Sequence, residues 1–224
     1  MSPAGVDIVT VALDTDVEAA RPFHEVAHPT HPSLVDPGHV MVGLFGMINV
    51  PFAIWIDEDG SIVRPAEIAF APRQSRENSG GVTDQEAFIA QLPEKQRTII
   101  QAMTVNMTDT DRYAAAVRDW AAHGADSEYV LSEAEVVERS RPRPPEFGLA
   151  AAHFELGQHL HRAGFPHDAV PHFQEAHRLD PTNWSYYREA LSLVDPAWGN
   201  VYERDMLSEV EAVGPETFYP PLDM

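Results

Sequence analysis

The chain contains no cysteine among its 224 residues. This absence excludes disulfide bonds and every chemistry that needs a thiolate as nucleophile or metal ligand. Basic residues are also scarce, since 15 Lys and Arg stand against 35 Asp and Glu and leave a net charge of −20. Binding to nucleic acid needs clustered cations, and anionic membranes attract basic segments, so this charge argues against both partners.

Long apolar runs are missing as well. No apolar stretch approaches the ~20 residues that span a bilayer, and Met1 to Asp7 lacks the basic region of a signal peptide. Hydrophobic residues still make up 44% of the chain, which suits a globular protein with a substantial core. We therefore expect a cytoplasmic protein of one or two domains that contacts no membrane.

The first part of the chain alternates short apolar runs with helical segments. Val6 to Leu13 is a β-branched run typical of a buried parallel strand. Asp14 and Asp16 offer N-cap oxygens for a helix over 17–27. The further elements expected here are a very short strand over 34–36, a helix over 39–45, a strand over 52–56 and, after the Asp59-Gly60 turn, a strand over 61–63.

This order of elements resembles the thioredoxin-like superfamily, in particular its TlpA and peroxiredoxin-type branch. Residues 9–14, 34–37 and above all 44–63 carry the resemblance. It implies that the peptide bond before Pro51 is cis and that Val50 offers backbone hydrogen bonds to a bound peptide, which makes both residues substrate-binding candidates. From the residues alone, Pro51 is equally explained as the start of an edge strand.

The chain differs from that family in the segment that carries the family's redox-active cysteines. Family members place a strand and a Cys-x-x-Cys helix ahead of the segment matched by Val6 to Leu13, whereas only Met1 to Gly5 precede it here. We expect no catalytic residue and no cofactor in the chain as written. Two explanations stay open: the redox centre was lost, or the reading frame begins late and the natural oxidoreductase or peroxidase is longer, with cysteine or selenocysteine. The missing central strand would expose its neighbours, which a partner protein or a second copy in a homodimer could cover.

Helices are expected to complete this first domain, which we place at residues 1–138 with its core match over 6–63. A polar loop over 73–81 leads into a helical extension over 83–123, which opens with a capping box at 83–86. Its last helix, over 109–122, carries an amphipathic stripe that would cover the sheet. Residues 139–146 are rich in proline and arginine and are the candidate linker.

A second resemblance follows the linker. Residues 147–183 are similar to a single tetratricopeptide repeat of ~34 residues. We place a helical domain at 147–195 and a tail at 196–224 with one short helix and an unstructured end. The resemblance leaves two alternative roles for the repeat. It could pack on the first domain or mediate self-association, or it could bind a partner protein. The candidate protein-binding positions are Leu156, Gly157, Leu160, Ala169, Phe173 and Ala176.

The 11 histidines do not form a recognisable metal motif. His24 and His28 have the i, i+4 spacing of a helical metal site. However, Pro22, Pro29 and Pro32 interrupt a regular helix there, and no carboxylate completes the ligand set. We predict no metal site and histidines that lie mostly at the surface.

Together these patterns predict an α/β fold, an incomplete thioredoxin-like domain followed by an all-helical, tetratricopeptide-like segment. The function they suggest is a protein of thiol-disulfide or peroxide redox ancestry that is redox-inactive as written. The alternative is a non-catalytic protein-binding or chaperone-like scaffold.

The absence of cysteine yields a first prediction. The chain as written should not reduce insulin disulfides in the presence of a thiol reductant above the rate of the protein-free blank, because it holds no thiolate to attack them. Turbidity of precipitating insulin measures this directly. A rate above the blank would contradict the prediction.

Overall fold

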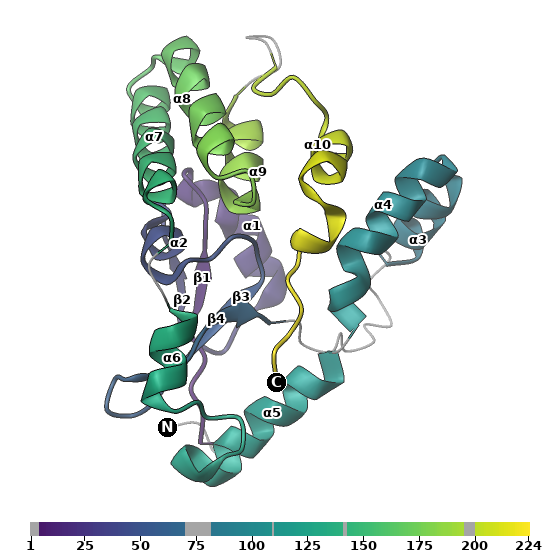
Figure 1. Cartoon of the computed structure of the whole chain (residues 1–224). Coiled ribbons are helices and arrows are strands. Elements are labelled where there is room, and N and C mark those ends of the chain that lie inside the picture. The colour runs from purple at the N-terminus through teal and green to yellow at the C-terminus, as the bar shows by residue number, and fades with distance from the viewer. Residues whose placement is uncertain (1–4, 70–81, 109, 141–142, 195–199) are drawn as a thin grey trace.

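The computed structural model describes residues 5–69, 82–108, 110–140, 143–194 and 200–224, without the side chains of 82–86 and 107–108 (Figure 1). It is a mixed α/β structure in which two small sheets lie among helices. Its strands are β1 (Thr10–Ala12), β2 (Ser33–Val35), β3 (Phe52–Ile56) and β4 (Ile62–Ile68). Its α-helices are α1 (Val17–Ala27), α2 (Val40–Phe45), α3 (Val82–Gln91), α4 (Glu94–Thr104), α5 (Thr110–His123), α6 (Glu133–Arg139), α7 (Pro145–Arg162), α8 (Pro166–Leu179), α9 (Trp184–Leu193) and α10 (Met206–Val213).

The strands form two separate two-stranded sheets within the described residues. Strands β1 and β2 are parallel, with Val11 opposite Leu34, and β3 and β4 are antiparallel, with Trp55 opposite Arg64. No strand joins the two sheets in this part of the chain. Strand β1 therefore pairs only with β2, and β3 pairs only with β4.

Most of the elements expected in the first part are confirmed. Helix α1 covers 17–27 as predicted, with the side chain of Asp16 accepting a hydrogen bond from the Glu18 N–H, and β3 covers 52–56. The strand expected over 6–13 was too long. Only Thr10–Ala12 forms β1, because prolines at 32 and 37 limit the partner strand to three residues.

Strand β4 is longer than the expected 61–63, although it contains Pro65. The register between β3 and β4 shifts between the Ala53–Glu67 and Trp55–Arg64 pairs, so that β4 carries an extra residue there. A bulge of this kind leaves one position unpaired and so tolerates a proline that lacks an N–H.

The helices after the sheets include one that the sequence analysis missed. Helix α6 begins with a capping box, in which the Ser132 side chain accepts from the Glu135 N–H and the Glu135 side chain accepts from the Ser132 N–H. The predicted loop over 73–81 lies outside the described residues. Helix α5 packs on β3 as expected, since the Trp55 Nε1–H donates to the Tyr113 hydroxyl at 3.0 Å and Trp120 stacks on Trp55.

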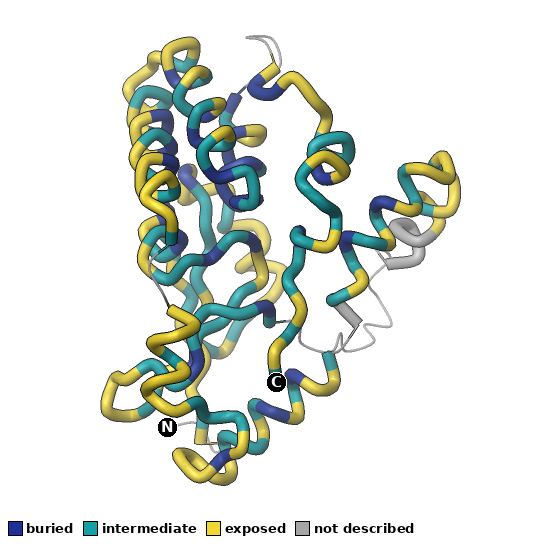
Figure 2. Tube along the Cα trace, viewed as in Figure 1, coloured by how far each residue is buried: buried dark blue, intermediate teal, exposed yellow. Residues whose placement is uncertain are grey.

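The helical segment packs directly on the first part of the chain. One continuous core contains Val42 of α2, Met103 of α4, Phe154 of α7 and Trp184 of α9, all buried (Figure 2). Packing on the first domain, one of the roles left open for the repeat, is therefore observed. The proposed boundary at 139–146 divides the sequence at the end of α6, but the hydrophobic core continues across it.

The tail is ordered, which corrects the expectation of an unstructured end. After α10, the Phe218 side chain is 2% exposed and packs against Trp184. The main chain of Asp223 then accepts a hydrogen bond from the buried Arg64 at 2.7 Å. The aromatic ring and the buried guanidinium hold this segment where local sequence offers neither helix nor strand.

In the described residues, no helix combines the length and the apolar character needed to cross a membrane.

Close contact between α7 and α8 depends on Gly157. A Cβ atom at this position would lie 2.6 Å from a ring carbon of Phe173, whereas a Cβ at Gly148 of the same helix would meet nothing within 4 Å. The two glycines therefore form a matched pair, one at a close helix contact and one in open space.

We expect Gly157→Ala to lower the free energy of unfolding by about 1–3 kcal/mol through overpacking. Gly148→Ala should instead raise it by about 0.5–1 kcal/mol, because alanine favours the helix. Urea unfolding of both variants measures the difference. Equal stability of the two would show that α7 and α8 are not in close contact at Gly157.

Candidate functional site

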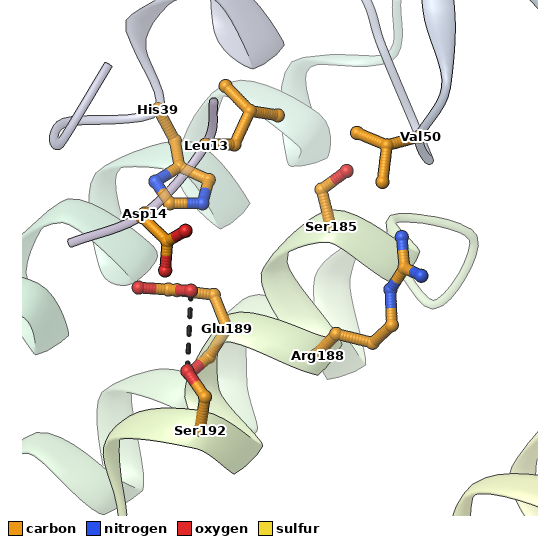
Figure 3. A pocket seen from close by; sticks show the side chains of 8 residues that line it. All are labelled: Leu13, Asp14, His39, Val50, Ser185, Arg188, Glu189 and Ser192. Carbon is orange, nitrogen blue, oxygen red and sulfur yellow. Dashed lines mark hydrogen bonds between the residues drawn. The ribbon is translucent and has the colours of Figure 1, made fainter. Parts of the chain in front are cut away.

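A cavity of about 240 Å³ lies where the ends of β1 and β3 meet helix α9 (Figure 3). Its walls come from segments that are far apart in sequence. The lining residues are Leu13, Asp14, His39, Val50, Ser185, Arg188, Glu189 and Ser192.

Helix α9 supplies half of these residues and is fixed to the first part of the chain by hydrogen bonds. The Asn183 side chain caps its first turn by accepting from the Tyr186 N–H. The Ser185 N–H donates to the carbonyl of Ile48, and the Glu189 carboxylate accepts from the buried N–H of Thr15 at 2.8 Å. These bonds determine which face of α9 lines the cavity.

Asn49 fixes the cavity wall next to Val50. Its side chain is fully buried, and its Oδ1 accepts from both the Val50 N–H and the Arg188 guanidinium. Its Nδ2 donates to the carbonyl of Phe218 at 2.8 Å. Since each polar atom of this amide has a partner, the loop before β3, helix α9 and the C-terminal segment are held in one arrangement.

His39 is buried against Phe154 and is held by Gln158 of α7. The Gln158 amide donates to the Thr15 hydroxyl at 2.6 Å and lies 3.1 Å from the Nδ1 of His39. Burial lowers the pKa of His39, and the nearby carboxylates of Glu189 and Asp36 oppose that shift in part.

Within the described residues, the charged groups of the cavity form no ion pair with a group of opposite charge. Burial raises the pKa of Asp14, and the neighbouring carboxylates of Glu189 and Asp16 raise it further. No described residue donates a hydrogen bond to the Asp14 side chain. Burial lowers the pKa of Arg188, whose hydrogen-bond partners are the uncharged Asn49, Tyr219 and carbonyl of Trp184.

These groups do not form a catalytic arrangement. Ser185 is the only hydroxyl on α9 that is buried in the cavity wall, and it has no hydrogen-bond partner in the described structure, so no base activates it. His39 is oriented by Gln158 rather than by a carboxylate.

The two substrate-binding residues predicted from the sequence lie differently in the structure. Val50 lines the cavity, whereas Pro51 is exposed beside it and is not part of the wall. The Val50–Pro51 peptide bond is cis, which confirms the geometry that the resemblance implied.

The six positions predicted on the repeat divide into buried and exposed ones. Gly157, Ala169, Phe173 and Ala176 are buried between the helices, so their side chains are inaccessible to a partner in this conformation. Leu160 is half-buried, and Leu156 is 42% exposed. The exposure of Leu156 leaves its side chain available at the surface.

Sequence reasoning missed most of the cavity. It assigned Asp14 as a cap, but Asp16 caps α1 and Asp14 faces the cavity. It predicted helix α9 but gave no role to Arg188 or Glu189. No local signal could have found them, because their neighbours Thr15 and Asn49 are 174 and 139 residues away along the chain.

Among the residues that the structure describes, no group of three or more histidine and carboxylate side chains is arranged to hold a metal ion. His24 lies on the exposed helix α1, and His28 follows the last residue of that helix in a left-handed conformation. Comparisons with protein-family models, with curated proteins and with solved structures find no match to this chain.

The buried, neutral His39 predicts a pH dependence of stability. Because burial holds the pKa of folded His39 below the ordinary histidine value of about 6.5, the stability that it contributes is complete above that value. That stability is lost as the pH falls from about 6.5 through the folded pKa, since only the unfolded chain then takes up the proton readily.

We expect His39→Gln to reduce the loss of stability between about pH 7.5 and pH 5.5 relative to the wild type. Urea unfolding at both pH values measures the change. His24→Gln, on the exposed face of α1, is the control and should keep the wild-type difference. An unchanged pH dependence in His39→Gln would show that His39 is not held neutral by the fold.

Proposed function

We propose that the chain as written is a non-catalytic protein-binding scaffold of thioredoxin-like redox ancestry. Its ligand in this proposal is an extended, basic polypeptide segment that pairs with the unpaired edges of β1 and β3. The observation that carries the proposal is the separation of the strands into two sheets, each with an open edge.

The open edge of β1 presents backbone N–H and carbonyl groups that an added strand could pair with. Thr10 and Ala12 bond toward β2, since the Thr10 N–H donates to Pro32 and the Ala12 carbonyl accepts from Asp36. In a parallel ladder the intervening residue points the other way, so the N–H and carbonyl of Val11 face the open edge. An extended peptide could pair there by strand addition.

One face of the β1–β2 sheet is apolar and uncovered. The register places Val11 beside Leu34, and Val9 shares their side of the sheet. Val9 is 54% exposed and Leu34 is 55% exposed. Because both faces of a parallel sheet are normally covered, this uncovered face supports an interaction with another polypeptide.

The two open strands approach one another at the cavity. Leu13 directly follows β1, Val50 lies two residues before β3, and both line the same cavity. A segment that entered between the strands would run past the cavity wall. The net charge of −20 favours a basic segment, because long-range attraction speeds the encounter of oppositely charged partners.

The resemblance described above adds to this proposal in two ways. The family places a central strand between the counterparts of β1 and β3, which is where the bound segment would lie in this proposal. Val50 is the residue that the resemblance assigns to peptide binding. The helical segment contributes by holding α9 against these strands. Leu156, the exposed candidate on α7, offers a second contact point for the same partner.

The experiment is selection of peptides from a random dodecapeptide library on the purified chain, followed by calorimetry with the selected sequences. We expect basic, β-prone peptides, with slower amide hydrogen exchange at Val11 and Ile54 when they bind. Leu34→Ser should weaken their binding by about tenfold through loss of apolar contact. Val40→Ser is the matched control, since Val40 is as exposed but lies on α2.

Three results would count against strand addition. One is a selection without basic peptides, and another is equal binding by Leu34→Ser and wild type. The third is protection of amides only on α7 and α8, which would place the partner on the repeat.

A further inference from the structure

The cavity combines a half-buried cation, a carboxylate without a hydrogen-bond donor in the described structure, and a buried hydroxyl that also has no partner there. We propose that it binds a small zwitterion of the amino-acid class, with the carboxylate of the ligand on Arg188 and Ser185 and its ammonium group on Asp14 and Glu189. This inference is independent of the peptide binding proposed above.

Ser185 is the observation that points to a ligand. Its side chain lines the cavity on the same wall as Arg188, and the residue is 6% exposed. Its Oγ is buried and makes no hydrogen bond in the described structure. Leaving a buried hydroxyl unsatisfied costs free energy, and an acceptor in the cavity would remove that cost.

Arg188 supplies the positive end. Figure 3 shows its side chain extending from α9 toward Val50, beside Ser185. It forms no ion pair with a carboxylate of the described chain, and Asn49 holds it in place. A guanidinium that is fixed by neutral groups can bind a carboxylate without first breaking a salt bridge.

Asp14 and Glu189 supply the negative end. The Asp14 carboxyl lies beside the carboxylate of Glu189 and the ring of His39 (Figure 3). Glu189 is held by the Thr15 N–H and the Ser192 hydroxyl, whereas Asp14 has no donor in the part of the chain described. An ammonium group between the two carboxylates would relieve their repulsion.

Two side chains of the cavity wall are apolar. Leu13 lines it near His39 and Asp14, and Val50 lines it beside the Arg188 guanidinium (Figure 3). A short methylene chain would fit against them while its two charged groups reach opposite ends. A simple anion would leave Asp14 and Glu189 unpaired, and a simple cation would leave Arg188 unpaired, so the zwitterion is the class that satisfies both.

The test is calorimetric titration of the full chain with glycine, 4-aminobutanoate and 6-aminohexanoate, with butanoate and butylammonium as ions of single charge. We expect at least one zwitterion to bind with a Kd of about 1 mM or tighter. Butanoate and butylammonium should bind at least about tenfold more weakly, since each engages one end only. The chain length of the preferred zwitterion then reports the distance between the ends.

Two variants separate binding from folding. Asp14→Asn is isosteric, and no described donor depends on the Asp14 carboxylate, so the protein should stay folded and lose binding by about tenfold or more. Ser185→Ala should weaken binding by about fivefold through loss of one hydrogen bond. Arg178→Gln, on the exposed face of α8, is the control and should bind as the wild type does.

The proposal would be overturned by any of three outcomes. These are no heat of binding with the three zwitterions up to about 10 mM, butylammonium or butanoate binding as tightly as the best zwitterion, and undiminished binding by folded Asp14→Asn. A negative result in these titrations would not contradict the proposed peptide binding, because the peptide selection tests pairing with the strand edges and the titrations test the cavity.

Discussion

The arrangement of this molecule depends on one buried amide. Asn49 is fully inaccessible to solvent, and its oxygen and nitrogen bond to Val50, Arg188 and the carbonyl of Phe218. A buried polar group is costly unless its bonds are made, so the three segments can meet only in the geometry that satisfies it. The cavity wall at Val50, the orientation of Arg188 and the course of the C-terminal segment follow from that geometry.

A second buried amide organises the opposite wall. Gln158, on α7, joins Thr15 and His39 and so connects the helical segment to the ends of β1 and α2. Asn49 holds Arg188 on one side of a space of about 240 Å³, and Gln158 holds the side chains of Thr15 and His39 on the other. The hydrophobic core supplies most of the stability, but it is these polar contacts that determine which side chains face the cavity.

Local elements could be predicted from the sequence, whereas the site could not. Helix α1 and strand β3 follow from an Asp cap and a β-branched apolar run, both of which act over a few residues. Gly157 was selected from the repeat pattern as a protein-binding candidate, but it lies at a close helix contact with Phe173. Arg188 and Glu189 look like ordinary polar positions of a helix, and only tertiary contacts give them a role.

The errors in the prediction have physical causes of the same kind. The strand over 6–13 was expected from its own residues, yet a strand extends only as far as its partner does. The tail was expected to contain one short helix and an unstructured end. Phe218 is nevertheless fixed in the core by Trp184, a contact that no local pattern reveals.

The bond between Asn49 and Phe218 also constrains how the chain reaches its native state. It joins residues 169 positions apart, so the wall beside β3 cannot form until most of the chain is available. Contacts of such long range require a large loop to close before they contribute, which slows folding relative to local helix pairing. The α7–α8 hairpin can therefore assemble from local contacts, whereas the wall beside β3 forms only when the C-terminal segment has been synthesised.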